Sequence, residues 1–153
     1  MLSRDIEFFL IDSLLSIEKI KRFSKNIQSA EELHKNDLVF NAIVRELEIL
    51  GEALKHIFRS EKFKNFIKPA WKIIIAFRNV IAHDYFGLDV EEIFKITKEE
   101  INIFEREFLD FLIKIKNNNI LREGILQTIN ELKNLGKIDT KQYLLKVSKK
   151  LNF

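Results

Sequence analysis

The sequence predicts an all-α protein, an antiparallel four-helix bundle with a C-terminal helical extension. Apolar residues recur at helical spacing along most of the 153-residue chain, which is long enough to bury a sizeable core. One proline and four glycines are too few for the tight turns that a protein built of many short strands requires. The lack of cysteine excludes a disulfide scaffold and a thiolate metal site.

The composition is typical of a globular protein of the cytoplasm. Apolar residues make up 46 % of the chain and charged residues 32 %. No apolar run approaches the roughly 18 residues of a membrane span, and Asp5 and Glu7 stand where a signal peptide would be uncharged. The net charge of +3 permits nucleic-acid binding without indicating it.

The first two predicted helices span residues 4–26 and 37–59. Both segments repeat apolar residues every three or four positions. Ser3 and Asp37 are the candidate N-caps, because their side chains can accept hydrogen bonds from the first turn of a helix. The polar residues between the two helices, 27–36, are predicted to form a loop.

Glycine and proline mark the position of a third helix. Gly51, in the middle of the second helix, costs about 1 kcal/mol relative to alanine, so we expect another helix to approach closely there. Pro69 suits the first turn of the third helix, and Gly87 is placed to end it.

A fourth, long helix is predicted over 90–116. Asp89 and Glu92 form a capping box at its start. Its apolar face is rich in phenylalanine. We interpret these rings and Trp71 as core rather than as platforms on which nucleobases stack.

Residues 117–153 form the predicted C-terminal extension. Three asparagines that begin at Asn117 break the helical pattern and mark a linker after a bundle domain of residues 1–116. Two short amphipathic helices follow, over 120–135 and 140–151. We expect the extension to cap the bundle or to enlarge a subunit interface. A nucleic-acid-binding hairpin is the weaker alternative, because acidic residues dilute its lysines.

The segment 78–89, RNVIAHDYFGLD, carries the most chemistry in the chain. Arg78, His83 and Tyr85 lie in an otherwise apolar run, where polar side chains are unfavourable unless they find partners. Together they suit phosphate chemistry. An arginine fork binds phosphate oxygens, a histidine carries a proton near neutral pH, and a tyrosine hydroxyl forms hydrogen bonds.

The helical phase separates Arg78 from His83. Residues five apart lie about 140° apart around an ideal helix, whereas Asn79 and His83, four apart, share a face. Either the Arg78 side chain wraps around the helix, or the helix is distorted, or a second subunit completes the site. The structural alternative is that Arg78 and His83 only pair with Glu48 or Glu52 inside the bundle.

The pattern Arg-x4-His-x-Tyr over residues 78–85 resembles the signature of HepT-like toxins, which are HEPN-domain proteins. Residues 45–57, with Gly51-Glu52-Ala53 at their centre, are similar to a second segment of that family, and the distance to 69–89 also fits. The resemblance extends over residues 4–116 and is absent from the extension. It implies a HEPN-type bundle and a ribonuclease toxin of a type VII toxin–antitoxin system, whose antitoxin is an MNT-type nucleotidyltransferase.

The resemblance also implies a site and a mechanism. HEPN ribonucleases generally place these motifs at a symmetric homodimer interface, which would remove the phase difficulty. RNA would be cleaved without metal or any other cofactor. His83 would act as base or acid, and Arg78 would bind the phosphate. Asn79 and Glu52 would support them by orienting the histidine, the arginine or the substrate.

Tyr85 has a regulatory role in this resemblance. In the family, the partner nucleotidyltransferase attaches AMP to the tyrosine of the His-x-Tyr motif and silences the toxin. The alternative is a plain hydrogen bond near the end of the helix. The alternative function for the whole chain is a catalytically silent HEPN subunit that docks a nucleotidyltransferase and presents its substrate.

The remaining histidines do not suggest a metal site. A di-metal bundle needs two Glu-x-x-His pairs, and the chain has only Glu31-x-x-His34, in the predicted loop. We therefore reject a metal. His34 and His56 are predicted to be surface residues.

Overall fold

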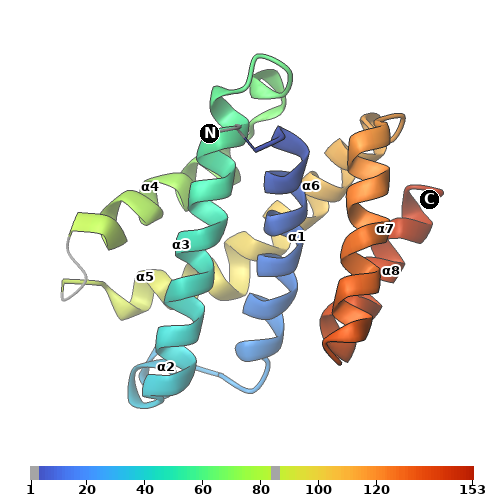
Figure 1. Ribbon diagram of the computed structural model, residues 1–153. Coiled ribbons are helices and arrows are strands. Elements are labelled where there is room, and N and C mark those ends of the chain that lie inside the picture. The colour runs from blue at the N-terminus through green and yellow to red at the C-terminus, as the bar shows by residue number, and fades with distance from the viewer. Residues whose placement is uncertain (1–3, 84–86) are drawn as a thin grey trace.

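Helices account for all regular secondary structure in the part of the chain that the structure describes. This computed structural model describes residues 4–83 and 87–153, and no strand occurs in those two ranges. The all-α class predicted from the sequence is confirmed. In chain order the elements are α1 (Ile6–Phe23), α2 (Ala30–Lys35), α3 (Asp37–Arg59), the 3₁₀ turn η1 (Lys64–Phe66), α4 (Pro69–His83), α5 (Val90–Lys95), the π-helical turn η2 (Ile96–Glu100), α6 (Ile101–Lys114), α7 (Asn119–Asn134) and α8 (Ile138–Lys150) (Figure 1).

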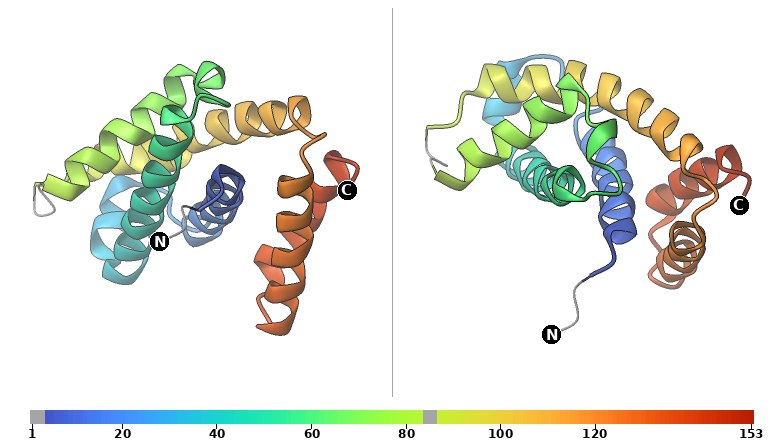
Figure 2. Two further views of the ribbon diagram at one scale, coloured as in Figure 1. Left: turned by 45° about the horizontal axis from the view of Figure 1, so that its top comes forward. Right: turned by 90° about the horizontal axis from the view of Figure 1, so that it is seen from above.

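The helix α3 lies between α1 and α4 (Figure 1). It runs antiparallel to α1, and the run from α5 to α6 crosses behind both helices in that view. The helices α7 and α8 stand side by side next to α1 (Figure 2). The helices α1 and α3 each bury an apolar stripe at helical spacing, which explains why both pack on their neighbours.

The core between α4 and α6 is aromatic. The ring centroid of Trp71 on α4 lies 5.3 Å from that of Phe104 and 5.5 Å from that of Phe108, both in edge-to-face contact. All three side chains are buried. The interpretation of these rings as core is confirmed.

A π-helical turn interrupts the long helix predicted over 90–116. Ile96 and Ile101 are both buried, yet residues five apart would lie about 140° apart on an α-helix. A π turn bonds residue i to residue i+5 and therefore turns both side chains to the same side. The prediction of one uninterrupted α-helix was wrong for this reason.

Three local predictions near the N-terminus need correction. The segment 27–36 is not only a loop, because it contains α2, whose N-cap Ser29 accepts a hydrogen bond from the backbone N–H of Glu32 at 3.1 Å. Asn36, rather than Asp37, caps α3. Asp5 is the N-cap residue of α1, and Ser3 lies outside the described residues.

The C-terminal extension packs along α1. Both of its predicted helices are present, as α7 and α8, although α8 begins at Ile138, two residues before the predicted start. Asn118, the N-cap of α7, donates a hydrogen bond to the buried carboxylate of Glu7 at 2.8 Å. The hydroxyl of Thr140 on α8 donates to Glu18 at 2.8 Å. Buried polar contacts therefore fix both helices of the extension to α1.

Candidate active site

Gly51 sets the distance between α3 and α4. A Cβ atom built on Gly51 would lie 2.3 Å from Cβ of Arg78 and 3.2 Å from the backbone oxygen of Ile74. The close helix approach predicted at Gly51 is therefore confirmed. Its consequence is that the Arg78 side chain leaves α4 directly against the backbone of α3.

The guanidinium of Arg78 is held by a carboxylate of α3. Its Nη2 lies 2.7 Å from Oε2 of Glu52, and its Nη1 donates a hydrogen bond to Oδ1 of Asn79 at 3.3 Å. The Arg78 side chain is 25 % exposed, so the guanidinium lies close to the surface beside its carboxylate partner. Glu48, the other predicted carboxylate, pairs instead with Arg45 at 2.6 Å.

His56 belongs to the same network. Its Nε2 lies 3.4 Å from Oε1 of Glu52, so one carboxylate contacts both Arg78 and His56. The His56 ring also stacks on Phe9 of α1, with 4.2 Å between the ring centroids. His56 is exposed, as predicted, but its contacts with Glu52 and Phe9 were not predicted. The four-residue spacing from Glu52 to His56 was the signal that pointed to the contact with Glu52.

Asn79 and His83 lie on the outer face of α4. Both are exposed, as are Ile73, Ala76 and Val80 on the same side of the helix. Within residues 4–83 and 87–153, no hydrogen bond or ion pair joins Arg78 to His83. The phase separation expected from the sequence therefore persists in the folded chain. Tyr85, the proposed site of AMP attachment, lies outside the described residues.

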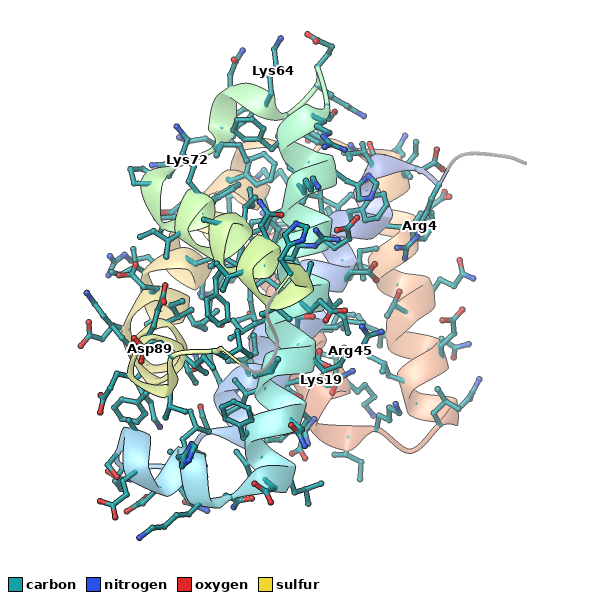
Figure 3. The ribbon with its side chains drawn as sticks, turned by 90° about the vertical axis from the view of Figure 1, so that its left-hand side faces the viewer. Arg4, Lys19, Arg45, Lys64, Lys72 and Asp89 are labelled. Carbon is teal, nitrogen blue, oxygen red and sulfur yellow. The ribbon has the colours of Figure 1, made fainter. Side chains whose placement is uncertain are left out.

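A cavity of about 280 Å³ adjoins Arg78, between α1, α3 and α4. Arg45 lines it from α3, and Arg4 lines it from the segment just before α1. Both arginines lie on the same side of α3 in Figure 3. An aromatic ring, that of Phe9, also lines it. Arg78, the arginine predicted to bind phosphate, therefore lines a cavity of the size of a small ligand fragment.

The described residues contain neither a metal-binding cluster nor a membrane-spanning helix. No group of three or more histidine, aspartate or glutamate side chains is arranged to hold a metal ion in the described ranges. No helix within those ranges is both long and apolar enough to cross a membrane.

Comparison with known proteins identifies the family. Residues 14–115 match the model of the family described as "Ribonuclease HepT-like". The chain belongs to this HepT-like ribonuclease family. The matched range contains Glu52, Arg78, Asn79, His83 and Tyr85 and leaves out α7 and α8.

Curated relatives of this HepT-like chain come from archaea and bacteria. "Putative RNase MJ1380" of Methanocaldococcus jannaschii is 38 % identical over 110 residues, which are 70 % of this chain and 96 % of that protein. "Probable ribonuclease HepT" of Thermococcus cleftensis is 33 % identical over 107 residues, 70 % of this chain and 96 % of that protein. "Putative RNase TTE0752" of Caldanaerobacter subterraneus subsp. tengcongensis is 32 % identical over 111 residues, 72 % and 94 % of the two chains. No solved structure matches the chain.

Proposed function

We propose that this HepT-like chain is a metal-independent RNA endonuclease in which Arg78 and His83 are the catalytic residues. The observation that carries the proposal is the guanidinium of Arg78, which pairs with Glu52 at 2.7 Å and lies five positions before His83 in a chain of a ribonuclease family. An arginine that is oriented before substrate arrives loses little freedom when it binds phosphate oxygens.

The proposed reaction uses the ribose 2′-hydroxyl of the RNA as the nucleophile. A His83 imidazole takes the 2′-OH proton, and the 2′ oxygen forms a bond to the adjacent phosphorus. The bond from phosphorus to the 5′ oxygen of the next nucleotide breaks, and that oxygen takes a proton from an acid. The products are a 2′,3′-cyclic phosphate end and a 5′-hydroxyl end. Arg78 offsets the negative charge that grows on the phosphate oxygens in the transition state.

A homodimer would supply both the base and the acid. The outer face of α4 combines His83 with exposed apolar side chains, Ile73 at 40 % and Val80 at 44 %. A two-fold axis at this face would cover the apolar side chains and bring two copies of His83 into one cleft. One imidazole would then act as the base, and the second imidazole, or water where that imidazole is absent, would protonate the leaving oxygen.

Control by a nucleotidyltransferase is the regulatory part of the proposal. Tyr85 follows His83 by two positions, so AMP attached to its hydroxyl would add a bulky negative group near the cleft proposed for RNA. The chain would then be the cytoplasmic toxin of a toxin–antitoxin pair whose antitoxin is an MNT-type nucleotidyltransferase. Support comes from the motif and from the family match.

The test is RNA cleavage by the purified chain in EDTA. We expect wild-type protein to cleave total RNA and leave cyclic phosphate ends. His83→Ala and Arg78→Ala should each lower the rate by about 100-fold or more, which is the usual size of acid–base and charge-stabilising contributions. His34→Ala, which changes an exposed histidine of α2, is the matched control.

Two results would contradict this proposal. If His83→Ala cleaves RNA as fast as wild type, the catalytic assignment is wrong. If no variant and no wild-type preparation cleaves RNA while the chain still binds a nucleotidyltransferase, the chain is the silent docking subunit instead.

A further inference from the structure

The cavity beside Arg78 contains further charged side chains that the proposed function does not use. Three arginines line it, and each has a carboxylate partner that also lines it. Arg78 pairs with Glu52 at 2.7 Å, and Arg45 pairs with Glu48 at 2.6 Å. The third pair, Arg4 with Asp12, is bidentate, since both terminal nitrogens of Arg4 donate to the Asp12 carboxylate.

Because Arg4 and Arg45 are each neutralised by a carboxylate, the cavity does not favour a second anion beside the phosphate that Arg78 binds in the proposed function. A phosphate group inside it would lie near three carboxylates as well as three guanidinium groups. A second phosphate subsite would instead present cations without paired acids. The ligand that fits is therefore neutral and offers both hydrogen-bond donors and acceptors.

The remaining lining of the cavity is apolar and aromatic. Ile49 and Ala53 of α3 contribute aliphatic surface, and Phe9 contributes its ring. The Cζ atom of Arg4 lies 5.0 Å from the centre of the Phe9 ring, on which His56 also stacks. The half-exposed Arg4 guanidinium therefore packs against the aromatic ring of Phe9. Arginine planes held in this way stack on nucleobases in RNA-binding proteins.

A nucleobase meets each of these requirements. It is planar and neutral, and its edge carries donors and acceptors together. Guanine offers acceptors at O6 and N7 for guanidinium groups and an amino donor for carboxylates. The volume of about 280 Å³ is enough to admit one base.

We propose that this cavity, whose lining includes the ion pairs of Arg4, Arg45 and Arg78 and the ring of Phe9, is a base subsite that binds guanine next to the phosphate to be cleaved. The inference rests on the proposed ribonuclease function. Arg78 lines the cavity and, in that function, binds the reacting phosphate. A base in the cavity is therefore one nucleotide, or a close neighbour, from the cut.

The first test maps the ends of cleaved total RNA by sequencing. Wild-type protein should show guanine at one fixed position beside the cut, about tenfold over the other bases. Glu48→Gln, which keeps the side-chain shape but removes the charge, should reduce that enrichment to near parity. Glu123→Gln, an exposed carboxylate on α7, is the matched control and should keep the enrichment. Equal base frequencies in wild type, or an enrichment unchanged in Glu48→Gln, would overturn the inference.

The second test does not depend on cleavage. The His83→Ala protein is titrated with GMP, with UMP and with inorganic phosphate, and the backbone amide signals of Ile49 and Ala53 are followed by NMR. GMP should shift these signals, whereas UMP and inorganic phosphate, which can reach Arg78 but lack a guanine base, should each shift them at least tenfold more weakly. Equal shifts with phosphate alone would mean an anion site and overturn the inference. GMP binding by a protein that never cleaves RNA would leave the subsite standing and reject the ribonuclease proposal.

Discussion

Gly51 leaves room for the first two side-chain carbons of Arg78 and thereby decides where the guanidinium can reach. Without this space, α4 would stand farther from α3, and the guanidinium would lose its 2.7 Å contact with Glu52. The glycine is unfavourable for the helix by itself, so its place in mid-helix is explained by this contact between two helices.

Replacing this glycine tests the argument directly. Gly51→Ala should lower the free energy of unfolding by about 1–3 kcal/mol, because the new Cβ would meet Cβ of Arg78 at 2.3 Å and the helices must separate. Urea unfolding measures the change. Gly124→Ala is the matched control, since its Cβ would meet the flexible end of a side chain, Cδ1 of Ile11, at 2.7 Å and would lie in ordinary contact with Cε1 of Phe8 at 3.6 Å. A Gly51→Ala protein as stable as the Gly124→Ala protein would contradict the close-packing argument.

The proposed regulation by AMP also depends on one residue, Tyr85. When the wild-type chain is co-expressed with a cognate nucleotidyltransferase, its intact mass should rise by one or more AMP units, and RNA cleavage should be lost. Tyr85→Phe removes the acceptor oxygen and keeps the ring, so that protein should gain no AMP at this position and should remain active. Mass spectrometry of peptides locates the adduct. An adduct on another residue, or none with an active nucleotidyltransferase, would favour inhibition by complex formation.

The contact between Arg78 and Glu52 could be anticipated from the sequence, because Gly51 marks where α3 and α4 meet and Glu52 follows it directly. The hydrogen bond from Arg78 to Asn79 was not anticipated, and the catalytic roles of these residues remain a proposal. The stacking of His56 on Phe9 was not predictable from spacing, since it depends on how α1 lies against α3. Local patterns carry the period of a helix but not the angle at which two helices cross.

At the scale of elements, the π-helical turn η2 shows a similar limit. Ile96 and Ile101 lie five residues apart, a spacing that would place them on different sides of an α-helix. The wider π turn brings both side chains into the core. The short helix α2 was missed because six mostly polar residues carry little periodic signal. Ser29, a residue type that favours the N-cap position, nevertheless indicated the start of α2.

The contact between α7 and α1 should make stability depend on pH. Burial raises the pKa of the Glu7 carboxyl, but hydrogen bonds from Asn118 and Lys62 outweigh it, so the pKa is lowered in the folded chain. A lowered pKa means that this carboxylate stabilises the fold above its unfolded pKa, near 4.3, and that the contribution is lost as pH falls through the folded pKa.

Glu7→Gln tests this contact. The variant should be less stable than wild type at pH 7, and the difference between the two free energies of unfolding should narrow as pH falls below about 4. Urea unfolding at pH 7 and at pH 3 measures both. The exposed carboxylate of Glu123 on α7 provides the control, because Glu123→Gln should differ from wild type by less than about 0.5 kcal/mol at either pH. A difference for Glu7→Gln that is the same at both pH values would contradict the assignment.

At the scale of the whole molecule, one chain holds the two proposed catalytic side chains on different sides of α4. Arg78 turns toward α3, and His83 lies on the outer face. A second copy placed against the apolar side chains of that face would double the number of both groups around one axis. Light scattering should then report about twice the 18.2 kDa mass of the chain.

Mixing two inactive variants separates a shared cleft from two independent sites. Arg78→Ala keeps His83, and His83→Ala keeps Arg78, so a mixed dimer contains one copy of each group. If both chains contribute to one cleft, unfolding and refolding the two proteins together should restore cleavage to a measurable fraction of the wild-type rate, well above either variant alone. Each variant refolded by itself is the control for recovery. If Arg78 and His83 must come from the same chain, every chain in the mixture lacks one of them and no activity returns, even when light scattering shows that mixed dimers have formed.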